Sequence, residues 1–179
     1  MDKKVLLISS SPRFGGNSDM LCDAFIKGAR AAGNLTDKIF LKNKHVNYCT
    51  GCGTCYNGAN PCPQKDDMAY ILGRMISADV IVMASPIYFY SVSAQLKTLI
   101  DRSCARYSEM VDKEFYFILT ATDDRISAMA CAVQELRSYI GCLDGAEEKG
   151  IVYGVGVWQP GDVQRTEAMK EAYNMGLSV

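Results

Sequence analysis

The sequence predicts an α/β fold in which a parallel sheet is covered by helices on both faces. Strand-like runs alternate with helical patterns five times, the strand-like runs are almost continuously apolar, and no repeat, low-complexity tract or linker divides the 179 residues. Nearly continuous apolar strands are typical of parallel sheets buried on both faces. Right-handed crossovers then make a doubly wound sandwich, with one domain over residues 1–179, the simplest arrangement.

Each expected strand is a short apolar run between turn residues, and each expected helix repeats apolar residues every three or four positions. Segment 43–67, rich in Cys, Gly and Asn, follows neither pattern and is interpreted as an inserted loop. In chain order the patterns predict strand 3–9, helix 17–32, strand 36–41, helix 68–77, strand 79–84, helix 93–106, strand 115–121, helix 126–140, strand 151–158 and helix 162–176.

Several helix ends carry their own signals. Short polar side chains accept hydrogen bonds from the first N–H groups of a helix, so Asn17 or Ser18 is expected to cap the first helix and Asp67 the second. Gly33 is the expected stop of the first helix, because glycine readily leaves the helical conformation. The segment 126–140 has the clearest apolar periodicity of a helix.

Composition and charge exclude several classes of protein. Nineteen Lys and Arg residues balance twenty Asp and Glu residues, which gives no electrostatic basis for binding nucleic acid or an anionic membrane. No stretch reaches the roughly 18 apolar residues of a membrane span, and Val5–Ile8 is too short for the core of a signal peptide. We therefore expect a cytoplasmic protein with no membrane span and no nucleic-acid partner.

Several single residues are assigned without a chemical role. Free cysteine packs as a small hydrophobe, so the scattered cysteines are expected in the core. His45, the single histidine, is expected on the surface near the insert, and Trp158 is interpreted as a packing residue. With no Ser-His-Asp or paired-carboxylate arrangement, a hydrolase is not supported. The scattered cysteines are Cys22, Cys104, Cys131 and Cys142.

The loop after the first strand has the composition of a phosphate site. Residues 9–18 read S-S-S-P-R-F-G-G-N-S and lead into a helix, whose free N–H groups and dipole favour an anion. Arg13 can grip two phosphate oxygens, whereas Asp19 opposes an anion unless its side chain turns away. The loop lacks the features of an NTP-binding P-loop or a dinucleotide fingerprint. An ordinary polar turn is the alternative. The candidate residues are Ser9, Ser11, Arg13, Gly16, Asn17 and Ser18.

A second loop, Ser85–Ser91, carries three aromatic residues at the same expected edge of the sheet. Such side chains offer a surface for a planar ring, while backbone N–H groups can bind the polar edge of that ring. The alternative is a hydrophobic loop that covers the core or a subunit interface. Thr120 ends the next strand at this edge. The candidate residues of the second loop are Pro86, Ile87, Tyr88 and Phe89.

The cysteine insert contains the sharpest motif, C-x2-C-x2-C-x6-C followed by proline. Three cysteines at successive spacings of three, with a fourth nearby, suit a 4Fe–4S cluster. Structural zinc more often uses two separated C-x2-C pairs, and unligated thiols are a further alternative. The candidate metal ligands are Cys49, Cys52, Cys55 and Cys62.

The two loops and the insert together resemble one known group. The run S-S-P-R-F-G-G-N-S-D-M-L is similar to the G-S-P-R-x-x-G-N-T-x-x-L signature of NADPH-dependent FMN reductases and iron–sulfur flavoproteins, except that Ser10 replaces a glycine. The run S-P-I-Y-F-Y-S-V-S-A-Q-L-K-T-L-I-D-R resembles a second segment of that group. The resemblance implies a flavodoxin-like three-layer sandwich with a five-stranded parallel sheet of order 2-1-3-4-5. It also implies that the first loop surrounds the FMN phosphate, that the second loop lines the flavin, and that the cysteine motif ligates a 4Fe–4S cluster.

The resemblance predicts an FMN-dependent oxidoreductase that passes electrons from NAD(P)H to a small-molecule or protein acceptor. Since the flavin carries the chemistry, no catalytic side chain is assigned. The alternatives are an electron carrier with FMN and 4Fe–4S, fed by ferredoxin-like donors, and a zinc-stapled binding module. Members of the group are commonly oligomers, so a homodimer or homotetramer is expected.

Overall fold

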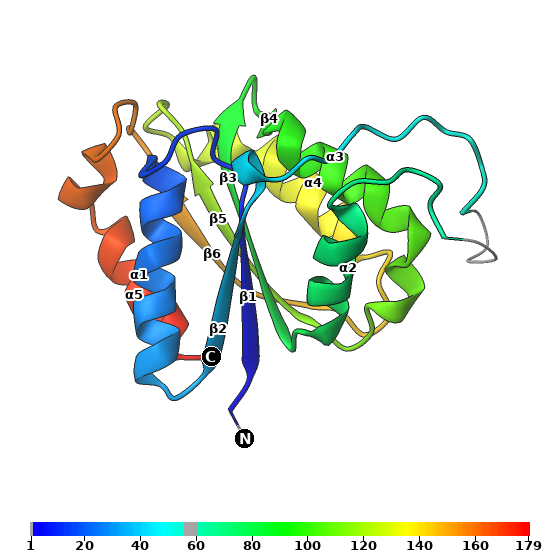
Figure 1. The fold of residues 1–179 in the computed structure, drawn as a ribbon. Helices are drawn as coiled ribbons and strands as arrows, with labels where there is room; N and C mark the ends of the chain where they lie inside the picture. Colours follow the sequence, from blue (N-terminus) through cyan, green and yellow to red (C-terminus); the bar gives the residue numbers. More distant parts are fainter. Residues whose placement is uncertain (1, 56–60) are drawn as a thin grey trace.

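The computed structural model describes residues 2–55 and 61–179 and contains a parallel sheet between two layers of helices (Figure 1). Five strands pair in parallel in the order β2-β1-β3-β5-β6, and the short β4 pairs antiparallel with the end of β3. The strands are β1 (Lys4–Ser9), β2 (Leu35–Phe40), β3 (Val80–Tyr88), β4 (Ser91–Val92), β5 (Glu114–Thr120) and β6 (Glu147–Gly154). The predicted order of five parallel strands is confirmed, with β4 as an addition.

The helices cover both faces of this sheet. On one face α1 and α5 pack side by side, and on the other lie α2, α3 and α4 (Figure 1). The helices are α1 (Asn17–Ala31), α2 (Met68–Ser77), α3 (Ala94–Arg102), α4 (Ala130–Ile140) and α5 (Ala168–Leu177). Short 3-10 turns cover Leu41–Asn43, Ser103–Ala105, Tyr107–Glu109, Ile126–Met129 and Asp162–Arg165.

The core has two halves because successive strand residues point to opposite faces. In β1, Val5 and Leu7 pack with α1 and α5, while Leu6 and Ile8 pack with the opposite layer. This alternation explains why the central strands β1, β3 and β5 are apolar at nearly every position. The periodicity of the sequence is therefore sufficient to predict a sheet covered on both faces.

Two glycines bring α1 and α5 into backbone contact. A Cβ atom added at Gly28 would lie 2.0 Å from the carbonyl oxygen of Tyr173, and one added at Gly176 would lie 2.1 Å from that of Phe25. Both distances are far below van der Waals contact, so only glycine allows this approach of the two helices.

The last strand differs most from the prediction. β6 spans Glu147–Gly154 rather than 151–158. As an edge strand it begins with polar residues, which the apolar pattern does not mark, and a bulge lies opposite Phe115 and Tyr116. Gly156, with φ +66°, then turns the chain, so Val157 and Trp158 leave the sheet and enter a loop.

The second loop and the helix caps also differ from expectation. β3 continues to Tyr88 and forms a hairpin with β4, so much of the predicted loop is strand. The N-cap of α1 is Gly16, without a side-chain cap, rather than Asn17 or Ser18. Asp67 stands at the N-cap of α2, but the helix N–H of Met68 donates to Asp66 at 3.1 Å instead.

The scattered cysteines do not share one environment. Cys22 is fully buried as predicted, whereas Cys104, Cys131 and Cys142 are exposed, so the core assignment is wrong for these three. They occupy the outer faces of helical segments or helix ends, where a small apolar residue is not forced inward. His45 is exposed, as predicted, and lies within the insert segment 43–67. No helix among the residues with described structure is long and apolar enough to cross a membrane.

Candidate functional site

An open cleft lies where the carboxyl ends of β1, β3 and β5 meet, and it measures about 510 Å³ with its mouth included. Nine of the eleven predicted cofactor residues line it: Ser11, Arg13, Gly16, Asn17, Ser18, Pro86, Ile87, Tyr88 and Thr120. Ser9 and Phe89 do not. The cleft is also lined by Pro12, Ala121, Thr122, Val157 and Trp158, of which the last two come from the loop after β6.

The first turn of α1 faces this cleft without a side-chain cap. A Cβ added at Gly16 would lie 2.6 Å from Ser11 Oγ and 3.1 Å from the carbonyl oxygen of Arg13, so the loop closes tightly around this position. Ser11 Oγ holds the turn by donating to that carbonyl at 2.9 Å and accepting from Arg13 N at 3.1 Å. The N–H groups that start α1 therefore point to a preshaped hollow, which is the arrangement that binds anions.

Asp19 does not oppose an anion here, because its carboxylate faces away from the cleft. Its Oδ1 lies 2.6 Å from Lys38 Nζ, and its Oδ2 accepts from Gly15 N at 3.2 Å. Burial lowers the pKa of Lys38, but hydrogen bonds to Asp19 and Asp23 outweigh this effect and raise the pKa above its ordinary value. The negative charge of Asp19 is thus paired with a lysine of β2.

The side-chain amide of Asn17 makes hydrogen bonds within the protein that shape the cleft, rather than serving mainly as a donor to a ligand. Its Nδ2 donates to the carbonyl oxygen of Gln159 at 2.9 Å, and its Oδ1 accepts from Gly161 N at 3.1 Å and Val163 N at 3.2 Å. The side chain therefore ties the loop after β6 to the start of α1. This use of its amide explains why Asn17 does not cap the helix.

Sequence reasoning missed Trp158. The residue is 58% exposed rather than packed in the core, and it forms one wall of the cleft. Arg13 Nη1 donates to its carbonyl oxygen at 3.1 Å, and the guanidinium carbon lies 5.8 Å from its ring centroid. In the sequence, Trp158 stands at the end of an apolar run. At that position the sequence pattern does not distinguish the last residue of a strand from the first residue of a loop.

Buried serines support the cleft from below. Ser93 Oγ donates to Ser10 Oγ at 2.8 Å, and Ser10 Oγ donates to the carbonyl oxygen of Ala84 at 2.8 Å. Ser85 Oγ accepts from Ser93 N at 2.8 Å. These bonds fix the ends of β1 and β3 relative to α3. Ser9 is fully buried, and its Oγ has no hydrogen-bond partner among the described residues.

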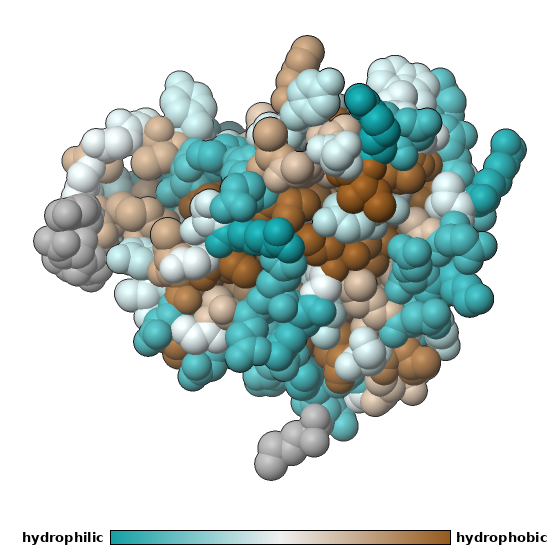
Figure 2. Space-filling model, turned by 180° about the vertical axis from the view of Figure 1, so that it is seen from behind, coloured by the Kyte–Doolittle hydropathy of each residue, from teal (hydrophilic) through white to brown (hydrophobic). Residues whose placement is uncertain are grey.

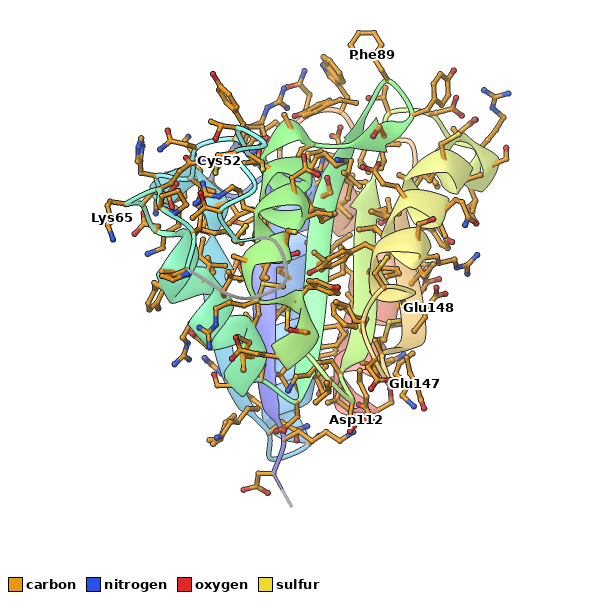
Figure 3. All side chains as sticks on the ribbon, turned by 90° about the vertical axis from the view of Figure 1, so that its right-hand side faces the viewer. Cys52, Lys65, Phe89, Asp112, Glu147 and Glu148 are labelled. Atoms are coloured by element: carbon orange, nitrogen blue, oxygen red, sulfur yellow. The ribbon has the colours of Figure 1, made fainter. Side chains whose placement is uncertain are left out.

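The aromatic hairpin closes the upper side of the cleft. Tyr88 lines the cleft, while Phe89 is completely exposed and points away from the body of the molecule at the hairpin tip (Figure 3). Phe89 and Tyr90 have φ values of +49° and +66°, which are unfavourable for bulky residues and usual for Asn-Gly in a two-residue turn. The hairpin therefore keeps two aromatic side chains at a cost in backbone strain.

The cysteine insert forms a second, separate pocket. All four predicted metal ligands, Cys49, Cys52, Cys55 and Cys62, line it together with Cys104 and Arg102. Residues 56–60 of the predicted insert lie outside the described residues. Within the described residues, no three His, Cys, Asp or Glu side chains converge closely enough to hold one metal ion.

A buried ion pair anchors this insert to α3. Arg102 Nη1 lies 2.7 Å from Asp66 Oδ2 and Nη2 lies 3.0 Å from Oδ1, with both side chains almost fully buried. Arg102 also donates to the carbonyl oxygen of Asn47 at 2.6 Å and to Cys62 Sγ at 3.5 Å. Burial would raise the pKa of Asp66, but hydrogen bonds from Arg102, Asn47 and Met68 lower it to about 2. Sequence reasoning placed Arg102 only within its helix.

Known proteins share both the sequence and the fold. Iron-sulfur flavoprotein MJ1083 of Methanocaldococcus jannaschii is 44% identical over 100 residues, which are 56% of this chain and 51% of that protein. The chain spans about half the length of this curated relative and of an Archaeoglobus fulgidus iron-sulfur flavoprotein. Bacillus subtilis YwqN, named as an NAD(P)H-dependent FMN-containing oxidoreductase, is 26% identical over 171 residues, 90% of each chain.

Among solved structures, an azoreductase from Bacillus anthracis superimposes with a TM-score of 0.77 at 19% identity, covering 99% of this chain and all of that one. At this identity the likeness establishes the shared flavodoxin-like fold. The profile of one family, NADPH-dependent FMN reductase, matches residues 3–156, which include every strand of the sheet and all the residues that line the cleft except Val157 and Trp158. This chain belongs to the NADPH-dependent FMN reductase family.

Proposed function

We propose that the chain is a single FMN-binding domain that transfers electrons from NAD(P)H to a second acceptor. The observation that carries this proposal is the uncapped start of α1, which opens into the cleft opposite an aromatic hairpin. A phosphate would fit at one end and a planar ring at the other. Family membership and the likeness to YwqN over 90% of the chain support the choice of FMN and NAD(P)H.

The residues of the cleft fit the parts of FMN. The hollow beside Gly16 is closed to a side chain but open to an anion, and Ser11, Ser18 and Arg13 surround it. Pro86, Ile87 and Tyr88 offer an apolar wall with backbone groups for the edge of a ring. In this proposal Asn17 acts through the loop that it holds, and Ser9 and Phe89 lie outside the direct lining.

When bound, FMN supplies two-electron chemistry by accepting a hydride and passing electrons onward. The protein positions the ring, and the exposed side chains of Tyr88 and Trp158 at the cleft are those that a second planar molecule, such as a nicotinamide or a quinone-like acceptor, would meet. The described lining of the cleft contains no His, Asp, Glu or Lys, so general acid–base catalysis by a cleft side chain is not part of the proposal.

The cysteine pocket favours a 4Fe–4S cluster over zinc. The four thiols surround one pocket without converging on a single point, and in a cluster each thiolate binds a different iron atom. The Arg102 guanidinium beside Cys62 would offset negative charge there. Cys52 and Phe89 lie toward the same end of the molecule, opposite Asp112 and Glu147 (Figure 3). An electron carrier that uses FMN and the cluster is therefore the second candidate function.

We further propose a homodimer or homotetramer in the cytoplasm. The exposed aromatic residues Phe89 and Tyr90 form a surface that a second copy could cover. Apolar patches also interrupt the hydrophilic face seen from behind (Figure 2). The free cysteines are compatible with a reducing compartment.

The test is an anaerobic absorption spectrum of fresh protein with iron and acid-labile sulfide assays on the same sample, followed by NAD(P)H oxidation with a quinone. Flavin bands and acceptor-dependent NAD(P)H oxidation are expected. Flavin that only a ferredoxin-like protein can reduce would favour the carrier. A protein that neither contains nor takes up FMN would overturn the proposal. Flavin bands without iron, even after cluster reconstitution, would leave the cysteines as thiols.

A further inference from the structure

The carboxylate of Asp162 organises the loop after β6 from outside the cleft. Its Oδ2 accepts hydrogen bonds from Trp158 N at 3.0 Å and from Gln159 N at 2.7 Å. Asp162 N donates in turn to the carbonyl oxygen of Gln159 at 3.1 Å. Asp162 itself is not among the residues that line the cleft, whereas Trp158 forms one of its walls. One carboxylate therefore fixes the backbone of a cleft residue without facing the cleft.

The loop that Asp162 fixes also holds Arg13, the one charged residue in the lining of the cleft. Arg13 Nη1 donates to the carbonyl oxygen of Trp158 at 3.1 Å, and its guanidinium carbon lies 5.8 Å from the centroid of the Trp158 ring. Within residues 2–55 and 61–179 this is the single hydrogen bond of the guanidinium, so Nε and Nη2 keep their N–H groups for an anion. The contacts thus run in series from Asp162 through Trp158 to Arg13.

We propose that Asp162 is a positioning residue for the phosphate of FMN, because it fixes Trp158, and Trp158 holds Arg13 beside the start of α1. The inference rests on the proposed FMN site and adds a residue that lies outside the cleft. An arginine side chain loses conformational freedom when it binds a phosphate, and it loses less when it is already held in place. Riboflavin carries no phosphate, so Asp162 should favour FMN and leave the affinity for riboflavin unchanged.

The charge of Asp162 alone predicts the opposite effect. A carboxylate repels a phosphate, so removing the negative charge would leave the affinity for FMN unchanged or raise it. Loss of the positioning contacts would lower that affinity instead. The sign of the change in FMN affinity therefore separates the proposed role of Asp162 from a simple effect of its charge.

The experiment measures dissociation constants of FMN and of riboflavin for the full chain, freed of bound flavin, by quenching of flavin fluorescence. Asp162→Ala is expected to weaken FMN binding about five- to tenfold and to change riboflavin binding by less than about twofold. Asp162→Asn keeps a side-chain oxygen that can accept the same two backbone bonds, so it should retain FMN binding within about twofold of the unaltered chain. Unchanged riboflavin binding also shows that the cleft of each variant is folded.

Arg13→Ala tests whether Asp162 acts through Arg13. Once the guanidinium is absent, there is no group left to position, so adding Asp162→Ala to Arg13→Ala should cause no further loss of the preference for FMN over riboflavin. If the two losses are independent and add, Asp162 acts by another route and the inference is wrong.

Asp79→Ala is the matched control, because Asp79 also accepts a backbone hydrogen bond, from Lys4 N at 2.8 Å, but at the opposite end of the sheet. This variant should bind both flavins as the unaltered chain does. The inference is overturned if Asp162→Ala binds FMN as tightly as the unaltered chain or more tightly, or if it loses both flavins equally. An unaltered chain that binds FMN no better than riboflavin would overturn the proposed phosphate site, and this inference with it.

Discussion

At the scale of single residues, the cleft depends on small and paired groups rather than on a reactive side chain. Gly16 leaves space that a Cβ atom would fill, Asp19 is neutralised by Lys38, and Asn17 uses its whole amide to hold a loop. In the proposed FMN site each of these features suits an anion, and none contributes a charge of the wrong sign.

Gly16→Ala is expected to weaken FMN binding at least tenfold, because the added methyl group would lie 2.6 Å from Ser11 Oγ and displace the loop of residues 9–18, which is proposed to bind the phosphate. Fluorescence quenching of FMN on titration with protein measures the dissociation constant. Gly73→Ala is the matched control, since a Cβ there meets nothing within 4 Å and alanine favours a helix. Equal affinity in both variants would show that the loop does not hold the phosphate.

Asp66→Asn is expected to destabilise the protein by about 3 kcal/mol at neutral pH, because it leaves Arg102 buried without its partner. The pKa of Asp66 is lowered in the folded state from 3.8 to about 2, so its contribution is present above about pH 4 and is lost as the pH falls toward 2. Urea unfolding between pH 3 and 7 measures this difference.

Asp101→Asn, which breaks an exposed pair with Lys97, should change stability by less than about 0.5 kcal/mol. An equally large loss in that control would argue against a special role for the buried pair.

At the scale of elements, backbone geometry determines which residues two features of the fold can accommodate. The first is the crossing of α1 and α5, where Gly28 and Gly176 let the helices touch. The second is the β3–β4 hairpin, which holds Phe89 and Tyr90 at positive φ. The helix crossing requires glycine at both positions. The hairpin, in contrast, holds two aromatic residues at positive φ values that smaller residues such as Asn and Gly adopt at lower cost.

Gly28→Ala is expected to lower the free energy of unfolding by about 3 kcal/mol or more, because its Cβ would overlap the carbonyl of Tyr173 and force the two helices apart. Chemical denaturation measures the change, with Gly73→Ala again as the control for a helical glycine in open space. A loss below about 1 kcal/mol would mean that α5 can shift at little cost.

Replacing Phe89 and Tyr90 by Asn and Gly is expected to stabilise the hairpin by about 1 kcal/mol, since both positions then suit their positive φ values. The same change removes two exposed aromatic side chains, so self-association should weaken. Thermal unfolding and sedimentation velocity give the two readouts. Unchanged association would place the subunit contact elsewhere on the surface.

At the scale of the whole molecule, the sheet brings distant segments to one edge. The ends of β1, β3 and β5 and the loop after β6 converge on the cleft, so ligand binding should stabilise the entire fold. The cysteine insert is attached to the same domain by Arg102 of α3, which donates a hydrogen bond to the carbonyl oxygen of Asn47.

FMN is expected to raise the melting temperature more than riboflavin, because only FMN carries the phosphate that the start of α1 would bind. At about 100 times its dissociation constant a ligand contributes about 2.7 kcal/mol, or roughly 5–10 °C in a chain of this size. Differential scanning fluorimetry at matched concentrations compares the two. Equal shifts would show that the ring alone is bound and that the first loop is an ordinary turn.

The sequence by itself determined the sheet, its five parallel strands, and nine of the eleven residues predicted for the cleft. These features follow from local signals: apolar runs, turn residues, and the rule that strand ends meet at one edge. The comparisons confirm the predicted family. The role of the cysteine motif as a metal centre stays a prediction.

The tertiary structure alone decided which residues complete each site. Trp158 reaches the cleft because an edge strand ends earlier than its apolar pattern suggests, and Asn17 is withdrawn from capping by a loop more than 140 residues away. Arg102 and Cys104 join the cysteine pocket because the end of α3 packs against the insert. These are contacts between segments far apart in the chain, and local periodicity carries no information about them.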